Sequence, residues 1–200
     1  MQNSNDFYVV GIGASAGGHD ALKDFFSHMP PDTGMAFVVV THLLRTHKSI
    51  LPRILSRFTA MPVLRMKGVD MLKPNTVFVL PENASADVKN GMLLLKPRKD
   101  DEIINKTIDE FFHALAEDQQ EKAIAIVFSG MGTDGADGVQ TIHAHGGIVL
   151  VQEPGSTAFK SMPDAAIRSD HPDEILPPAQ LAENLLKIIS EKRQQVYKES

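Results

Sequence analysis

Four continuous runs of apolar residues, rich in β-branched side chains, constrain the fold of this chain more than any other feature. They cover residues 7–12, 35–41, 123–128 and 148–152. A strand with one face in water alternates polar and apolar residues, whereas a strand buried on both faces is apolar throughout. The runs therefore predict a parallel sheet that is covered on both faces.

Helix-like segments separate these runs, at residues 19–29, 49–58, 108–117 and 138–145. Parallel strands need such crossover connections, and a repeated alternation of strand and helix is typical of wound α/β folds. We predict an α/β fold in which a wound, mostly parallel sheet lies between two layers of helices, a Rossmann-like three-layer arrangement. An amphipathic helix is expected from residue 181 onward.

The middle of the chain breaks this alternation. Short strands are predicted at residues 76–80 and 92–96, on either side of a polar turn region at 82–91. Two short strands joined by a turn are typical of a hairpin. A small antiparallel hairpin is therefore expected beside the parallel sheet.

Composition limits the classes of function. The 200 residues, 42% of them hydrophobic, suffice for one sizeable core, so we expect a single domain over 1–200 with its core at about 7–190. A formal charge of −5 without a basic stripe disfavours nucleic-acid binding. The absence of cysteine excludes thiol chemistry. With neither a signal peptide nor an apolar run of roughly 20 residues, a cytoplasmic protein without membrane insertion is expected.

A serine lies in a glycine-rich turn directly after the first predicted strand. The segment Gly13-Ala14-Ser15-Ala16-Gly17 matches the G-x-S-x-G elbow, in which small flanking residues permit a strained backbone that exposes the nucleophilic hydroxyl. The N-terminus of the following helix would favour a developing oxyanion. Ser15 is therefore a candidate nucleophile.

Two other interpretations of this turn stay open. Glycine-rich strand-to-helix turns also bind phosphate, and Gly11-x-Gly13 begins a dinucleotide fingerprint. The third glycine is misplaced for that fingerprint, however, and the second strand ends in Thr41-His42 instead of an acidic residue that would bind a ribose. Alternatively, Ser15 is a simple helix cap.

A nucleophilic serine needs a base to take its proton and an acid to orient that base. Among the eight histidines, His42 directly follows a buried strand, and ligands bind beyond the carboxyl ends of parallel strands. His47, in the same loop, is a weaker rival. His42 is therefore the candidate base, and a structural, hydrogen-bonded histidine is the alternative.

The candidate acid lies in a glycine-dense loop, SGMGTDG at 129–135, which follows the strand at 123–128. Glycines let the backbone approach a reacting group and aim its N–H groups at an anion. Asp134 is the better placed carboxylate, because Asp137 falls in the first turn of the next helix, where acidic residues are common. An ordinary turn aspartate is the alternative. The chain order Ser, His, Asp differs from the order in α/β-hydrolases.

Together these motifs resemble the catalytic domain of the CheB methylesterase family, from about Tyr8 to Leu186. The serine turn resembles the family's nucleophile turn, Thr41-His42 its histidine, and the loop at 130–135 its aspartate loop. Residues 152–154 and 161–163, QEP and SMP, resemble the segments that follow. The resemblance implies a largely parallel wound sheet with a small antiparallel hairpin.

The resemblance also implies a serine hydrolase that demethylates γ-glutamyl methyl esters on chemoreceptors and often deamidates receptor glutamines. Ser15, His42 and Asp134 would form its catalytic triad. The backbone N–H groups of Met131 and Ala16 would stabilise the oxyanion, and no metal or organic cofactor would be required. The implied partners are cytoplasmic helices of methylated chemoreceptors, or a related methylated protein of bacterial signal transduction. A catalytically silent or nucleotide- or phosphate-binding sensory module of the same fold is the alternative.

Two departures from the family's pattern concern regulation. Only about six residues precede the first predicted strand, so the phosphorylatable receiver domain of the family is not expected. The segment at 43–48 resembles esterase domains fused to methyltransferase and sensor domains in larger signalling proteins. Such domains of a longer chain are therefore further expected partners.

Overall fold

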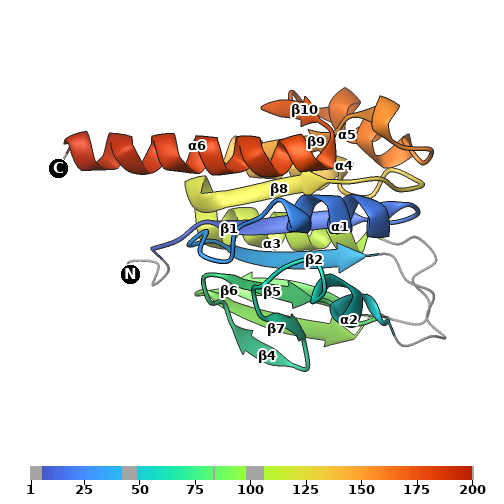
Figure 1. The fold of residues 1–200 in the computed structure, drawn as a ribbon, viewed down its shortest axis with the longest axis horizontal. Coiled ribbons are helices and arrows are strands. Elements are labelled where there is room, and N and C mark those ends of the chain that lie inside the picture. Colours follow the sequence, from blue (N-terminus) through green and yellow to red (C-terminus); the bar gives the residue numbers. More distant parts are fainter. Residues whose placement is uncertain (1–5, 42–48, 83, 98–105, 200) are drawn as a thin grey trace.

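A computed structural model describes residues 6–41, 49–82, 84–97 and 106–199 of this chain. Its main sheet is built from these strands, in chain order: β1 Val9–Ala14, β2 Ala36–Thr41, β3 Val63–Arg65, β5 Thr76–Val79, β8 Ala123–Val127, β9 Ile148–Gln152 and β10 Glu174–Leu176. Within the described residues the strand order is β10-β9-β8-β1-β2-β5-β3, and all pairs are parallel. The arrowheads of β2 and β8 accordingly point to the same edge (Figure 1).

Helices cover both faces of this sheet. One face packs against α1 (Gly18–Ser27), α2 (Leu51–Leu55) and α6 (Pro178–Glu199), and the other against α3 (Thr107–Gln119), α4 (Ala136–Ala144) and α5 (Ser161–Ser169). In Figure 1, α1 lies in front of the sheet and α3 behind it. The 3₁₀ turns η1 (Gln120–Lys122) and η2 (Pro154–Ser156) complete the set of helical elements in the described residues. The predicted three-layer α/β fold is confirmed.

The sequence of β1 explains why the two layers differ. Val10 and Ile12 point toward the layer that contains α1 and are fully buried there. Gly11 and Gly13 face α3, where a Cβ on Gly11 would come within 2.9 Å of both Phe111 and Leu115. Because glycine leaves this space free, α3 packs directly onto the central strand.

The small antiparallel sheet differs in detail from the predicted hairpin. It consists of β4 (Val69–Met71), β6 (Ala84–Lys89) and β7 (Met92–Pro97), in the order β4-β7-β6. The predicted strand at 76–80 was wrongly assigned to this hairpin, because β5 is fully buried and belongs to the main sheet. The predicted turn region at 82–91 instead contains β6. The polar residues of β6 concealed it, and the tight turn is Asn90-Gly91, whose φ values are 53° and 71°.

The described residues include no helix that is long and apolar enough to cross a bilayer. The longest helix of the described residues, α6, is polar on average. It packs against the sheet through buried residues such as Leu181 and Leu185. It begins at Pro178, three residues earlier than predicted. Proline is favoured at such a helix start, because its missing N–H would lack an intrahelical partner anyway.

Candidate active site

Ser15 lies in a tight turn between β1 and α1. Its N–H donates to the carbonyl of Ser129 at 2.9 Å, and its own carbonyl accepts from the N–H of Gly18 at 2.9 Å. Gly17 precedes α1 with φ 74°, in the left-handed region that favours glycine. The serine is therefore held at the carboxyl edge of β1, bonded to Ser129, which lies two residues after the end of β8.

Gly130 forms the other wall of this turn. A Cβ on Gly130 would come within 2.0 Å of Met162 Sδ and 2.9 Å of Ser15 Cβ. The Gly130 N–H donates to the carbonyl of Phe159 at 2.9 Å, and its carbonyl accepts from the N–H of Met162 at 3.1 Å. Only glycine fits here, and the loop after β8 therefore packs closely against Ser15.

Ser129 connects the serine turn to the loop that follows β9. Its side chain is fully buried, and its Oγ lies 2.7 Å from the Ala16 carbonyl, 2.7 Å from Thr157 Oγ1 and 3.3 Å from the Phe159 carbonyl. Its N–H donates to Gln152 Oε1 at 2.8 Å. Sequence reasoning gave Ser129 no role, because it stood only as the first residue of the glycine-dense loop that contains the candidate acid.

Asp134 lies on the loop between β8 and α4, and its side chain is buried. Its Oδ2 accepts from the N–H of Ile108 and its Oδ1 from the N–H of Asp109, both at 2.9 Å. These donors belong to the first turn of α3. Two N–H groups and the positive end of a helix stabilise negative charge on a carboxylate.

Asp109 accepts hydrogen bonds in the opposite direction, from the end of the loop that carries Asp134 and from the first turn of α4. Its Oδ1 accepts from the N–H groups of Gly135 at 2.8 Å, Asp137 at 3.1 Å and Gly138 at 2.9 Å. Burial raises the pKa of the Asp109 carboxyl, and the negative charges of Asp134 and Asp137 raise it further. Lys106 bonds Asp137 at 3.0 Å, which raises the pKa of Lys106.

The predicted base and its rival both follow β2 in the sequence. His42 and its rival His47 lie outside the described residues. Thr41, the residue before His42, ends β2 and is the parallel partner of Ala14, the residue before Ser15. The chain therefore leaves β1 and β2 at the same level of the sheet, one residue before Ser15 and one residue before His42.

The predicted oxyanion donors, Ala16 and Met131, lie on the turns after β1 and β8. Within the described part of the chain, neither of their N–H groups has a hydrogen-bond acceptor. The Met131 side chain is 62% exposed. The described part of the fold therefore uses neither of these two N–H groups.

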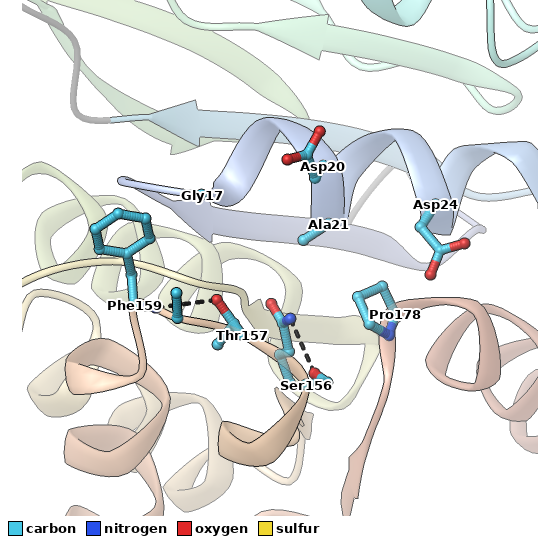
Figure 2. Close-up of a pocket in the computed structure, with 10 residues that line it drawn as sticks. Gly17, Asp20, Ala21, Asp24, Ser156, Thr157, Phe159 and Pro178 are labelled. Atoms are coloured by element: carbon cyan, nitrogen blue, oxygen red, sulfur yellow. Dashed lines mark hydrogen bonds between the residues drawn. The ribbon is translucent and has the colours of Figure 1, made fainter.

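A pocket of about 370 Å³ lies beside the serine turn, between α1 and the segment after β9. Figure 2 shows Asp20 and Asp24 on the α1 side and Ser156, Thr157 and Phe159 on the other. The two carboxylates make this end of α1 a poor phosphate site. Among the described residues, no group of three or more His, Asp or Glu side chains is arranged to hold a metal ion.

Comparison with known proteins gives one consistent result. The family model described as CheB methylesterase matches residues 10–185. The crystal structure of the Thermotoga maritima CheB methylesterase catalytic domain has a TM-score of 0.83 and 26% identity to this chain, and the match covers 92% of this chain and 99% of that domain.

Curated relatives agree with this match. A protein-glutamate methylesterase/protein-glutamine glutaminase 2 of Burkholderia pseudomallei (strain 1710b) is 27% identical over 187 residues, 93% of this chain and 55% of the relative. A protein-glutamate methylesterase/protein-glutamine glutaminase of Methanosarcina barkeri is 28% identical over 192 residues, 91% of this chain and 52% of the relative. The chain thus spans about half the length of these relatives. With the fold and the two glycine-rich segments, the serine turn and the loop at 129–135, in place, the chain belongs to the CheB methylesterase family.

Proposed function

We propose that this chain is a serine hydrolase that demethylates γ-glutamyl methyl esters, and deamidates glutamines, on chemoreceptors or related methylated signalling proteins. Ser15 is the proposed nucleophile, His42 the general base and Asp134 the orienting acid. Membership of the family and the names of the curated relatives support this reaction. Since the substrates are the cytoplasmic helices of receptors, the proposed location is the cytoplasm.

One observation carries the proposal: Ser15 is bonded through its N–H to the start of the loop that bears Asp134. The 2.9 Å bond from Ser15 to the Ser129 carbonyl joins the turn after β1 to the loop after β8. The pairing of Ala14 with Thr41 brings the end of β2 to the same edge. Nucleophile, base and acid thus each follow one of three adjacent strands.

The proposed reaction has two stages. Ser15 Oγ attacks the ester carbonyl while His42 takes its proton, and the imidazolium then protonates the departing methoxide, which leaves as methanol. Asp134 stabilises the imidazolium, and the N–H groups of Ala16 and Met131 stabilise the oxyanion. Water activated by His42 then hydrolyses the γ-glutamyl serine ester and releases the receptor glutamate.

The phosphate-binding alternative is disfavoured by the charges beside the turn. Asp20, in the first turn of α1, has a side chain that is 85% exposed, and Asp24 follows one turn later. A phosphate at the N-terminus of α1 would meet two carboxylates and, within the described residues of α1, only one cation, Lys23, which already pairs with Asp20. A thermal shift with nucleotides in the absence of esterase activity would favour that alternative.

The proposal is tested by methanol release from a receptor fragment that carries labelled methyl esters. We expect release by the wild type, and a decrease by several orders of magnitude for Ser15→Ala and for His42→Ala, because triad residues act as a unit. Ser27→Ala, at the exposed end of α1, is the matched control and should retain wild-type release. Undiminished release by Ser15→Ala would show that the assignment of the nucleophile is wrong.

A further inference from the structure

Two buried carboxylates, Asp109 and Asp134, each cap a helix. Asp134 caps α3, which carries Asp109, and Asp109 caps α4, which follows Asp134. The N–H of Asp109 donates to Asp134 Oδ1 at 2.9 Å, and the N–H of Gly135 donates back to Asp109 Oδ1 at 2.8 Å. These two bonds and the Asp134–Gly135 peptide close a ring. The ring fixes Asp134 from both its side chain and its backbone.

We propose that Asp109 is a positioning residue for Asp134, through which it sets the orientation of the catalytic histidine. The assignment rests on the proposed function, because it presumes that Asp134 is the acid of the triad. Asp109 does not touch the reacting atoms in this scheme. It acts by holding the loop from which Asp134 projects.

The hydrogen-bond pattern supports a positioning role for Asp109, because one oxygen, Asp109 Oδ1, accepts from three N–H groups. They are the N–H groups of Gly135, Asp137 and Gly138, at 2.8 to 3.1 Å. Gly135 directly follows Asp134, and its φ of 97° is a value that an L-residue rarely adopts. Without this acceptor, three N–H groups at the start of α4 would lose their hydrogen-bond partner. The strained turn at Gly135 would also lose the bond that restrains it.

The surrounding charges show why a carboxylate is tolerated in so buried a place. Asp109 is 4% exposed and lies near two other carboxylates, Asp134 and Asp137. Lys106 Nζ is 3.9 Å from Asp109 Oδ2 and 3.0 Å from Asp137 Oδ2, so it partly neutralises the cluster. Backbone N–H groups satisfy the oxygen that faces the loop.

Two substitutions separate the acceptor from the charge. Asp109→Ala removes the acceptor, and we expect kcat to fall by about 10- to 100-fold with KM nearly unchanged, because small displacements of a catalytic group cost that much. Asp109→Asn keeps an acceptor oxygen and is a good helix cap, so we expect kcat within about threefold of the wild type. Glu110→Gln is the matched control, since Glu110 lies in the same first turn of α3 with an exposed side chain, and its kcat should equal that of the wild type.

A double-mutant cycle distinguishes positioning from a merely structural role. If Asp109 acts through Asp134, Asp109→Ala should have almost no further effect on kcat once Asp134→Ala is present. Rates are normalised to folded protein by circular dichroism, at a temperature below the unfolding transition of every variant. Losses that multiply in the double variant would overturn the assignment, as would an Asp109→Asn variant as slow as Asp109→Ala.

Failure of this inference is distinguishable from failure of the proposed function. A wild type that releases methanol, together with a folded Asp109→Ala variant of equal kcat, would refute the role of Asp109 alone. A wild type that neither releases methanol nor reacts at Ser15 with a fluorophosphonate would refute the esterase and the positioning role together.

Discussion

Ala14 of β1 and Thr41 of β2 are direct partners in the parallel ladder. Ser15 and His42 are the next residues along the two strands. Parallel pairing in register therefore ends the strand before the proposed nucleophile and the strand before the proposed base at one level of the sheet edge. The loop after β8, on the other side of β1, reaches the same edge through the bond between Ser15 and Ser129.

Gly130→Ala tests the close contact between the aspartate loop and the serine. The new Cβ would overlap Met162 Sδ at 2.0 Å and press on Ser15 Cβ at 2.9 Å, so we expect a loss of about 1–3 kcal/mol in the free energy of unfolding. Hydrolysis should fall as well, because Ser15 is displaced. Denaturant unfolding and methanol release measure the two effects.

The control for this change is Gly155→Ala, since a Cβ there meets nothing within 4 Å. We expect its stability to be unchanged or slightly increased, because alanine has fewer unfolded conformations. Equal stability and activity of the two variants would show that the packing of Gly130 against Ser15 does not matter.

Ser129→Ala tests the connection between the serine turn and the loop after β9. The substitution leaves the Ala16 carbonyl and Thr157 Oγ1 without their 2.7 Å contacts. We expect the free energy of unfolding to fall by about 1–3 kcal/mol, together with a decrease in kcat. Ser27→Ala, at an exposed site, should change stability by less than about 0.5 kcal/mol. A kcat equal to that of the control would argue against any role of Ser129 in holding Ser15.

The raised pKa of Asp109 predicts a pH dependence of stability. Burial, with help from the neighbouring Asp134, raises this pKa above its ordinary value of 3.8, so ionisation is less favourable in the folded chain than in the unfolded chain. The stabilisation is therefore fully present below pH 3.8 and is lost as pH rises through the folded-state pKa.

Asp109→Asn cannot titrate and supplies the reference for this effect. The free energy of unfolding of the wild type, minus that of Asp109→Asn, should decrease as pH rises from about 4 toward neutrality. Urea unfolding of both proteins across this range measures the difference. A difference that stays constant or grows with pH would contradict the raised pKa.

The parallel core could be predicted from sequence because its strands carry one unambiguous signal. The range 148–152 matches β9, and 123–128 exceeds β8 by one residue. Strand β6 could not be predicted in the same way, because Ser85, Asp87 and Lys89 resemble a polar turn. Its stability comes from pairing with β7, which is a tertiary interaction.

In the candidate site, too, some residues could be predicted from the sequence and others could not. The glycines of the loop at 129–135 made Asp134 recognisable in the sequence as a candidate acid. Asp109 has no comparable motif, since it is one of two acidic residues in the first turn of an ordinary amphipathic helix. Its partner lies 25 residues away along the chain, and only the packing of α3 beside α4 brings the two together.

Covalent labelling tests the nucleophile, which is the central claim, most directly. The chain would be treated with a serine-directed fluorophosphonate, digested, and mapped by mass spectrometry. We expect one adduct, on Ser15, with parallel loss of methanol release, and no adduct in Ser15→Ala. An adduct on Ser129 or Ser156, or full ester hydrolysis by Ser15→Ala, would contradict the account.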